Sequence, residues 1–103
     1  MMIMLRDDRV IELFESPENP PDWIEGIDIE NQEYQFCSDS GQIYIGHIIK
    51  PSGIFSEAVW KLKPDGKPDM ENLERLIDKA EMIEPNDKFT DLKELKNFTQ
   101  PVK

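Results

Sequence analysis

Cysteine and histidine are scarce in this chain, which has one of each among its 103 residues. A single cysteine cannot form an intramolecular disulfide, and small secreted domains usually carry several, so we expect a reducing, cytoplasmic compartment. Zinc sites need three or four Cys, His or carboxylate ligands at short spacings, and here only carboxylates are plentiful. The sequence therefore predicts neither a transition-metal site nor a cofactor.

The motifs of common catalytic sites are missing as well. Five scattered glycines form neither a P-loop nor a G-x-G-x-x-G loop, and no serine lies in a G-x-S-x-G elbow. Cys37 and His47 suggest a nucleophilic dyad, but a hairpin loop over residues 38–41 would pair Cys37 with Gln42, five residues before His47. At about 3.4 Å per residue the two side chains are roughly 17 Å apart. We therefore predict that the protein is not an enzyme.

Long apolar runs are also missing. The first five residues, MMIML, are apolar, and Arg6, Asp7 and Asp8 follow directly. Such a run is too short for the core of a signal peptide and far too short to span a bilayer. We expect it to form the first strand or a frayed terminus, and we expect no contact with a membrane.

Positive charge is in short supply, because 12 Lys and Arg stand against 22 Asp and Glu, for a net charge of −10. Residues 1–41 hold eleven acidic and two basic residues, a net charge of −9, whereas residues 42–103 hold eleven and ten, a net charge of −1. This balance argues against direct binding to nucleic acid or to an anionic membrane. The length fits one domain, residues 1–103.

Three prolines interrupt the acidic half within residues 16–22, SPENPPD. Proline lacks a backbone N–H and fixes φ, so this segment is predicted to be a surface loop. Trp23 follows the loop directly and belongs to no regular strand, so we expect it to be partly exposed. An aromatic side chain rimmed by carboxylates suits a protein interface. The candidate partner-binding residues are Asp7, Asp8, Glu12, Glu15, Glu18, Asp22, Trp23 and Glu25.

Apolar and polar residues alternate with a period of two before residue 64, which predicts strands. The segments are residues 8–15, 26–30, 33–37, 42–50 and 55–63, with turns at 38–41, 51–53 and 64–66. Residues 42–50 carry apolar side chains on both faces and are expected to form a central strand. Sequential strands with short connections predict a curved antiparallel meander of four to five strands.

The period changes to 3.6 after Pro68, which predicts a helix over residues 70–83 with Asp69 as its N-cap. Its apolar face is predicted to comprise Met70, Leu73, Leu76, Ile77, Ala80 and Ile83. Glu71 and Arg75 are spaced to form an ion pair. A short C-terminal helix over residues 91–98, capped by Thr90, would pack through Leu92, Leu95 and Phe98. The fold class is therefore α+β, with the first helix on the sheet and the second at an edge or end.

The acidic half favours a small non-enzymatic interaction module that binds a basic protein surface. Immunity proteins, antitoxins, DNA mimics and accessory subunits include small acidic domains of this type. A solvated acidic face that only improves solubility explains the same charge. The alternative function is a small-molecule or divalent-ion binding domain or an enzyme accessory subunit, with Asp28, Glu30 or Asp39 as ion ligands. Exposed sheet edges also leave a homodimer open.

Overall fold

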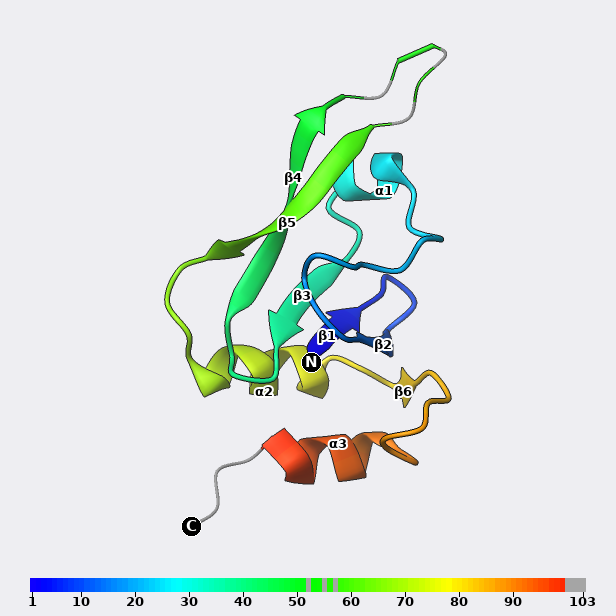
Figure 1. Ribbon diagram of the computed structural model, residues 1–103. Coiled ribbons are helices and arrows are strands. Elements are labelled where there is room, and N and C mark those ends of the chain that lie inside the picture. Colours follow the sequence, from blue (N-terminus) through cyan, green and yellow to red (C-terminus); the bar gives the residue numbers. More distant parts are fainter. Residues whose placement is uncertain (52, 55, 57, 100–103) are drawn as a thin grey trace.

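Six strands and three helices occur in residues 1–51, 53, 54, 56 and 58–99, which the computed structural model describes (Figure 1). In chain order they are β1 (Met2–Leu5), β2 (Val10–Phe14), α1 (Gly26–Glu30), β3 (Gln35–Ser38), β4 (Ile43–Lys50), β5 (Val59–Asp65), α2 (Met70–Asp78), β6 (Met82–Ile83) and α3 (Leu92–Thr99). The predicted α+β class is confirmed. Within these ranges, no helix has the length and apolar character needed to cross a membrane.

The strands form one mixed sheet in the order β5-β4-β3-β1-β2-β6. The predicted antiparallel meander of four to five strands is wrong in three respects: the sheet has six strands, β6 pairs parallel to β2, and β3 pairs with β1 instead of with β2. β1 and β2 form a tight hairpin whose turn places Arg9 at a φ of 64°. The long connection over residues 15–34 then carries the chain to the other side of β1.

The apolar N-terminal run forms β1, which lies between β3 and β2 and is buried along its whole length. Ile3 and Leu5 enter a hydrophobic cluster with α2 and α3, whereas Met2 and Met4 enter a second cluster on the opposite face. A strand covered on both faces needs apolar residues at every position, and this explains the absence of alternation in MMIML. The alternative of a frayed terminus is excluded.

Residues 26–30 form the one-turn helix α1, so the strand predicted there is wrong. A strand would turn both isoleucines to one face, but Ile27 is 53% exposed and Ile29 is 5% exposed. Two alternating isoleucines are too short a pattern to separate a strand from a single helical turn. The loop predicted for residues 16–22 is confirmed, since it contains only turns and irregular backbone.

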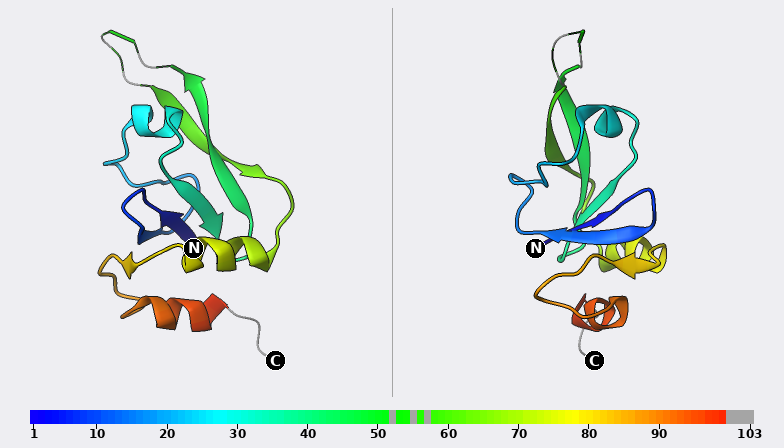
Figure 2. Two further views of the ribbon diagram at one scale, coloured as in Figure 1. Left: turned by 180° about the vertical axis from the view of Figure 1, so that it is seen from behind. Right: turned by 90° about the vertical axis from the view of Figure 1, so that its right-hand side faces the viewer.

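β4 and β5 form a long antiparallel ribbon that projects from the body of the sheet, while α2 and α3 lie at the opposite end (Figure 2). β4 lies between β3 and β5 as predicted, but its Ile45 and Ile49 are about half exposed, so one face of the strand is not fully covered. Leu62 of β5 is buried in the second hydrophobic cluster. Residues 52, 55 and 57 of the predicted 51–53 turn and 55–63 strand lie outside the described residues.

α2 begins as predicted, because the Asp69 side chain accepts a hydrogen bond from the Glu71 backbone N–H. The helix ends at Asp78 instead of at residue 83. The chain then leaves the helix so that Glu81 and Glu84 donate their backbone N–H groups to the carbonyls of Arg9 and Ile11. These hydrogen bonds satisfy backbone carbonyls at the edge of β2. Such long-range pairing outweighs the local tendency of the sequence to continue the helix.

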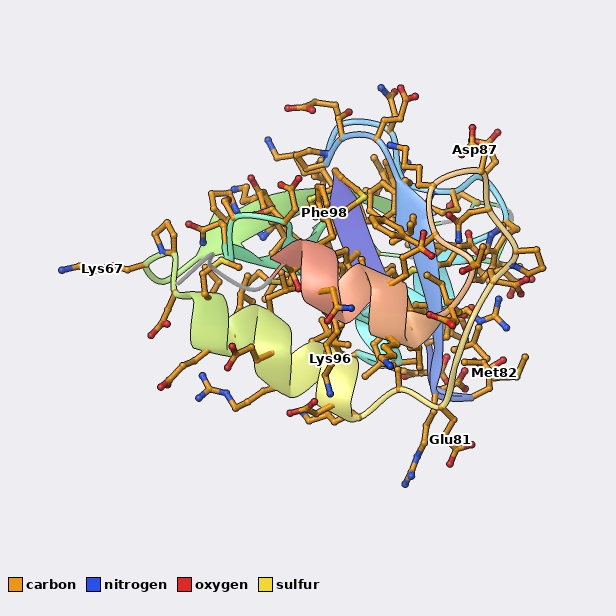
Figure 3. All side chains as sticks on the ribbon, turned by 90° about the horizontal axis from the view of Figure 1, so that it is seen from below. Lys67, Glu81, Met82, Asp87, Lys96 and Phe98 are labelled. Atoms are coloured by element: carbon orange, nitrogen blue, oxygen red, sulfur yellow. The ribbon has the colours of Figure 1, made fainter. Side chains whose placement is uncertain are left out.

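α3 packs against the same cluster through Leu95, which is fully buried. Its first turn is capped by Asp91, whose carboxylate accepts from the Glu94 N–H, while Thr90, the predicted cap, donates its hydroxyl to the Glu94 carboxylate. Lys96 and Phe98 point to opposite sides of α3 (Figure 3). Lys96 pairs with Asp78 of α2. Phe98, predicted to lie on the packing face, is 60% exposed.

Candidate functional site

Arg6, at the end of β1, joins three carboxylates from different parts of the chain. Its Nε and Nη2 atoms donate to the two oxygens of Asp8 at 3.1 and 2.6 Å, and Nη1 donates to Glu84 at 2.7 Å and to Glu12 at 3.4 Å. The guanidinium lowers the pKa of Asp8, and the hydrogen bonds that Arg6 donates to Asp8 and Glu84 raise the pKa of Arg6 above its ordinary value. Two predicted site residues, Asp8 and Glu12, are thus already bound to a cation.

Trp23 lies beside this group and is held on three sides. Its indole N–H donates to Glu12 Oε2 at 2.9 Å, its ring meets the edge of Tyr34 at a centroid distance of 5.8 Å, and the Arg6 guanidinium lies 5.8 Å from the ring centroid. The side chain is nevertheless 47% exposed, as the sequence predicts. Trp23 is therefore a fixed aromatic side chain at the protein surface.

A second acidic group adjoins Trp23 through Tyr34, whose hydroxyl donates to Asp28 at 3.3 Å. Burial and the negative charge of Asp28 raise the pKa of Tyr34 to about 12. A hydrogen bond with Asp28, together with repulsion from Asp28 and Asp7, raises the pKa of Glu33 from its ordinary value. The negative charges of Asp28 and Asp7 therefore disfavour ionisation of Glu33.

The remaining candidate residues lie on the connection between β2 and α1. Their side chains are exposed: Glu15, Glu18, Asp22 and Glu25. The structure thus brings Asp8 and Glu12 together with Trp23 through Arg6, and places Asp7 near Glu33. The four loop acids lie in other surroundings. The candidate residues therefore do not form one uniform acidic face.

The residues considered as ion ligands do not converge. Asp28 contacts Tyr34, whereas Asp39 lies 3.7 Å from the N-terminal ammonium group. Asp28 and Glu30 were expected on one strand face, but they lie two positions apart on a helix, which turns them in different directions. No group of three or more His, Cys, Asp or Glu that could hold a metal occurs in the described residues.

Cys37 and His47 lie on neighbouring strands of the sheet. The sequence predicts that Cys37 lies opposite Gln42 in the hairpin. In the structure Cys37 lies opposite Ile43, so the predicted register is wrong by one residue. His47 is four residues further along β4, about 14 Å away, which is too far for a hydrogen bond between the two. Cys37 is buried, and burial raises the pKa of its thiol to about 11.

Sequence reasoning missed Arg6 and Glu84 as members of the group around Trp23. One signal was available, because Arg6 is one of only two basic residues among the first 41. Glu84 was not predictable, since it reaches Arg6 only when β6 pairs with β2. Comparisons of the chain with protein-family models, with curated proteins and with solved structures find no match.

Proposed function

We propose that this protein is a small non-enzymatic interaction module that binds a basic protein surface through its N-terminal half. Immunity proteins, antitoxins, DNA mimics and accessory subunits are the types of module that fit this description. The observation that carries the proposal is Trp23, a half-exposed indole held in place beside Glu12, Arg6 and Tyr34.

A fixed tryptophan at the surface is well suited to anchor a partner. Tryptophan is among the residues that contribute most to binding energy at interfaces. Because the Glu12 hydrogen bond and the Tyr34 ring already orient the indole, little side-chain freedom remains to be lost on binding. An indole that served only to cover the core would be expected to be more deeply buried than Trp23.

The charges around Trp23 favour a cationic partner. Asp22 and Glu25 flank the indole in the sequence and are exposed. Asp28 and Asp7 disfavour the negative charge of Glu33, and a Lys or Arg of the partner would relieve this repulsion. Asp8 and Glu12 already contact Arg6, so the partner is expected to contact Asp7 and the exposed loop acids more than those two residues.

The proposal is tested by comparing the proteins that copurify with tagged variants from native lysate. Trp23→Ala removes the anchor, and D22K/E25K reverses two charges beside it. The matched control E74K/D87K makes the same charge change at exposed positions in the C-terminal half. A partner that is retained by the wild type and by the control but lost from both test variants supports the proposal. An identical set of captured proteins for all four baits contradicts it and leaves solubility as the role of the acidic half.

A further inference from the structure

A groove with a volume of about 470 Å³ lies over β3 and β4, on the sheet between the C-terminal end of α1 and the side of α2. α1 and α2 lie at opposite ends of this strand pair (Figure 1). Cavities of some 300–1,000 Å³ are typical of sites for small molecules. Of the residues around Trp23, Tyr34 lines the groove, whereas Arg6, Glu12 and Trp23 itself do not.

The local sequence explains why the groove is open. β3 pairs with β4 only at Phe36 and Cys37, and β4 continues beyond this pairing to Lys50. α1 occupies the space beside the rest of β4 because Gly46 has no side chain, and a Cβ atom there would collide with Ile29. The two strands and the two helices thus border a groove that is partly open to solvent.

Apolar side chains from both hydrophobic clusters line the groove. Ile29, Tyr44 and Leu76 line it, together with Ile45, whose side chain is 49% exposed. An exposed isoleucine at the opening of a hollow gains from contact with an apolar ligand, since the contact removes its surface from water. The body of a suitable ligand is therefore apolar.

The α2 wall carries two cations, Arg75 and Lys79. Both contact neutral amides: Arg75 donates to Asn72 Oδ1 at 2.8 Å and Lys79 donates to Gln35 Oε1 at 3.4 Å. An amide orients a cation without cancelling its charge. Arg75 also contacts one carboxylate, Glu71, as Arg9 and Lys96 each contact one, whereas Arg6 contacts three.

Two carboxylates of α2 lie close enough to affect this wall. Glu71 lies 3.4 Å from the Arg75 guanidinium, at an exposed position where water screens the pair. Asp78 is bound by Lys96 of α3. Glu71 is thus the carboxylate on α2 that competes directly with an incoming anion for Arg75.

We propose that the groove is a binding site for a small amphipathic anion, with an apolar body over Ile45 and Leu76 and a carboxylate or similar group at Arg75 and Lys79. Neither the charge nor the motifs of the sequence predict this site, because its cations come from α2 and its floor from strands more than twenty residues away. The groove adjoins the proposed acidic interface through Tyr34, but the variants that test each proposal change different residues, so either proposal can fail without the other.

The test uses two fluorescent dyes that share an apolar ring system but differ in charge. The anionic dye is 8-anilinonaphthalene-1-sulfonate, and the neutral dye is N-phenyl-1-naphthylamine. We expect saturable binding of both at one site. R75Q/K79Q should weaken binding of the anionic dye about fivefold to tenfold and leave that of the neutral dye within about twofold. K88Q/K93Q, which removes two exposed lysines elsewhere, should change neither.

Two further variants separate this site from nonspecific dye binding. Ile45→Ser should weaken both dyes, because the side chain contributes to the apolar floor. Glu71→Gln should tighten binding of the anionic dye, since it removes the competing carboxylate from Arg75; a variant that merely damaged the fold would not do so. Absence of saturable binding overturns the proposal, as does an equal effect of R75Q/K79Q and K88Q/K93Q on the anionic dye.

Discussion

Arg6 is expected to stabilise the folded chain more than any other surface cation, and Arg6→Gln tests this. The substitution leaves Asp8, Glu12 and Glu84 close together without their shared partner. Partly exposed ion pairs each contribute roughly 0.5 kcal/mol, so losing three contacts should lower the free energy of unfolding by about 1.5 kcal/mol at neutral pH and low salt. Arg9→Gln is the matched control, because Arg9 makes one exposed pair with Glu81 at 3.5 Å, and it should cost less than about 0.5 kcal/mol.

The assay is urea denaturation at pH 7 and at pH 3, followed by circular dichroism and by tryptophan fluorescence. Because Arg6 holds the pKa of Asp8 below its ordinary value, this stabilisation is present above the ordinary carboxyl pKa and is lost as the pH falls through the lowered one. The difference between the variant and the wild type should therefore shrink at low pH. Equal stability losses for Arg6→Gln and Arg9→Gln at pH 7, or a loss for Arg6→Gln that does not change with pH, would refute the reasoning.

Three further changes test other parts of the structure. Glu33→Gln should raise the urea midpoint at pH 7 but not at pH 3. The pKa of Glu33 is raised in the folded state, so ionisation of Glu33 costs stability as the pH rises through that pKa. A lower urea midpoint for the variant at pH 7 would contradict this reasoning. Cys37 should react with a thiol reagent at pH 8 at least about a hundredfold more slowly in the folded protein than in urea, because the thiol is buried and its pKa is about 11. Equal reaction rates would argue against the pairing of β3. Gly41→Ala should lower the free energy of unfolding by more than about 1 kcal/mol, as measured by urea titration. The reason is that φ is +87° and that a Cβ would lie 2.5 Å from the Asp69 carbonyl oxygen. Gly66→Ala should cost less, because Gly66 has a φ of +72° but open space around it.

The sequence predicted those elements whose signals are local. Asp69 caps α2 because its side chain reaches a backbone N–H two residues away, and the hairpin over residues 38–41 follows from its serine, aspartate and glycine residues. The partly exposed position of Trp23 followed from its place after the proline loop. Each of these features depends on a few neighbouring residues.

Features set by distant residues were not predictable. β6 leaves the pattern of α2 because the free edge of β2 offers hydrogen bonds to Glu81 and Glu84. The order of the sheet depends on the crossing of residues 15–34 past β1, for which the sequence carries no periodic signal. The candidate site shows the same division, since its acids could be listed from the sequence but the role of Arg6 in joining Asp8, Glu12 and Glu84 could not.

The central claim is that the acidic N-terminal half binds a basic protein, and the most direct test is the salt dependence of that binding. The measurement is the Kd between the purified chain and the partner captured in the experiment above, at sodium chloride concentrations from 50 to 500 mM. We predict that affinity falls steeply as salt rises, and that E74K/D87K follows the wild type while D22K/E25K binds weakly at every concentration. An affinity that stays constant across this range, or that D22K/E25K leaves unchanged, would contradict the proposed function.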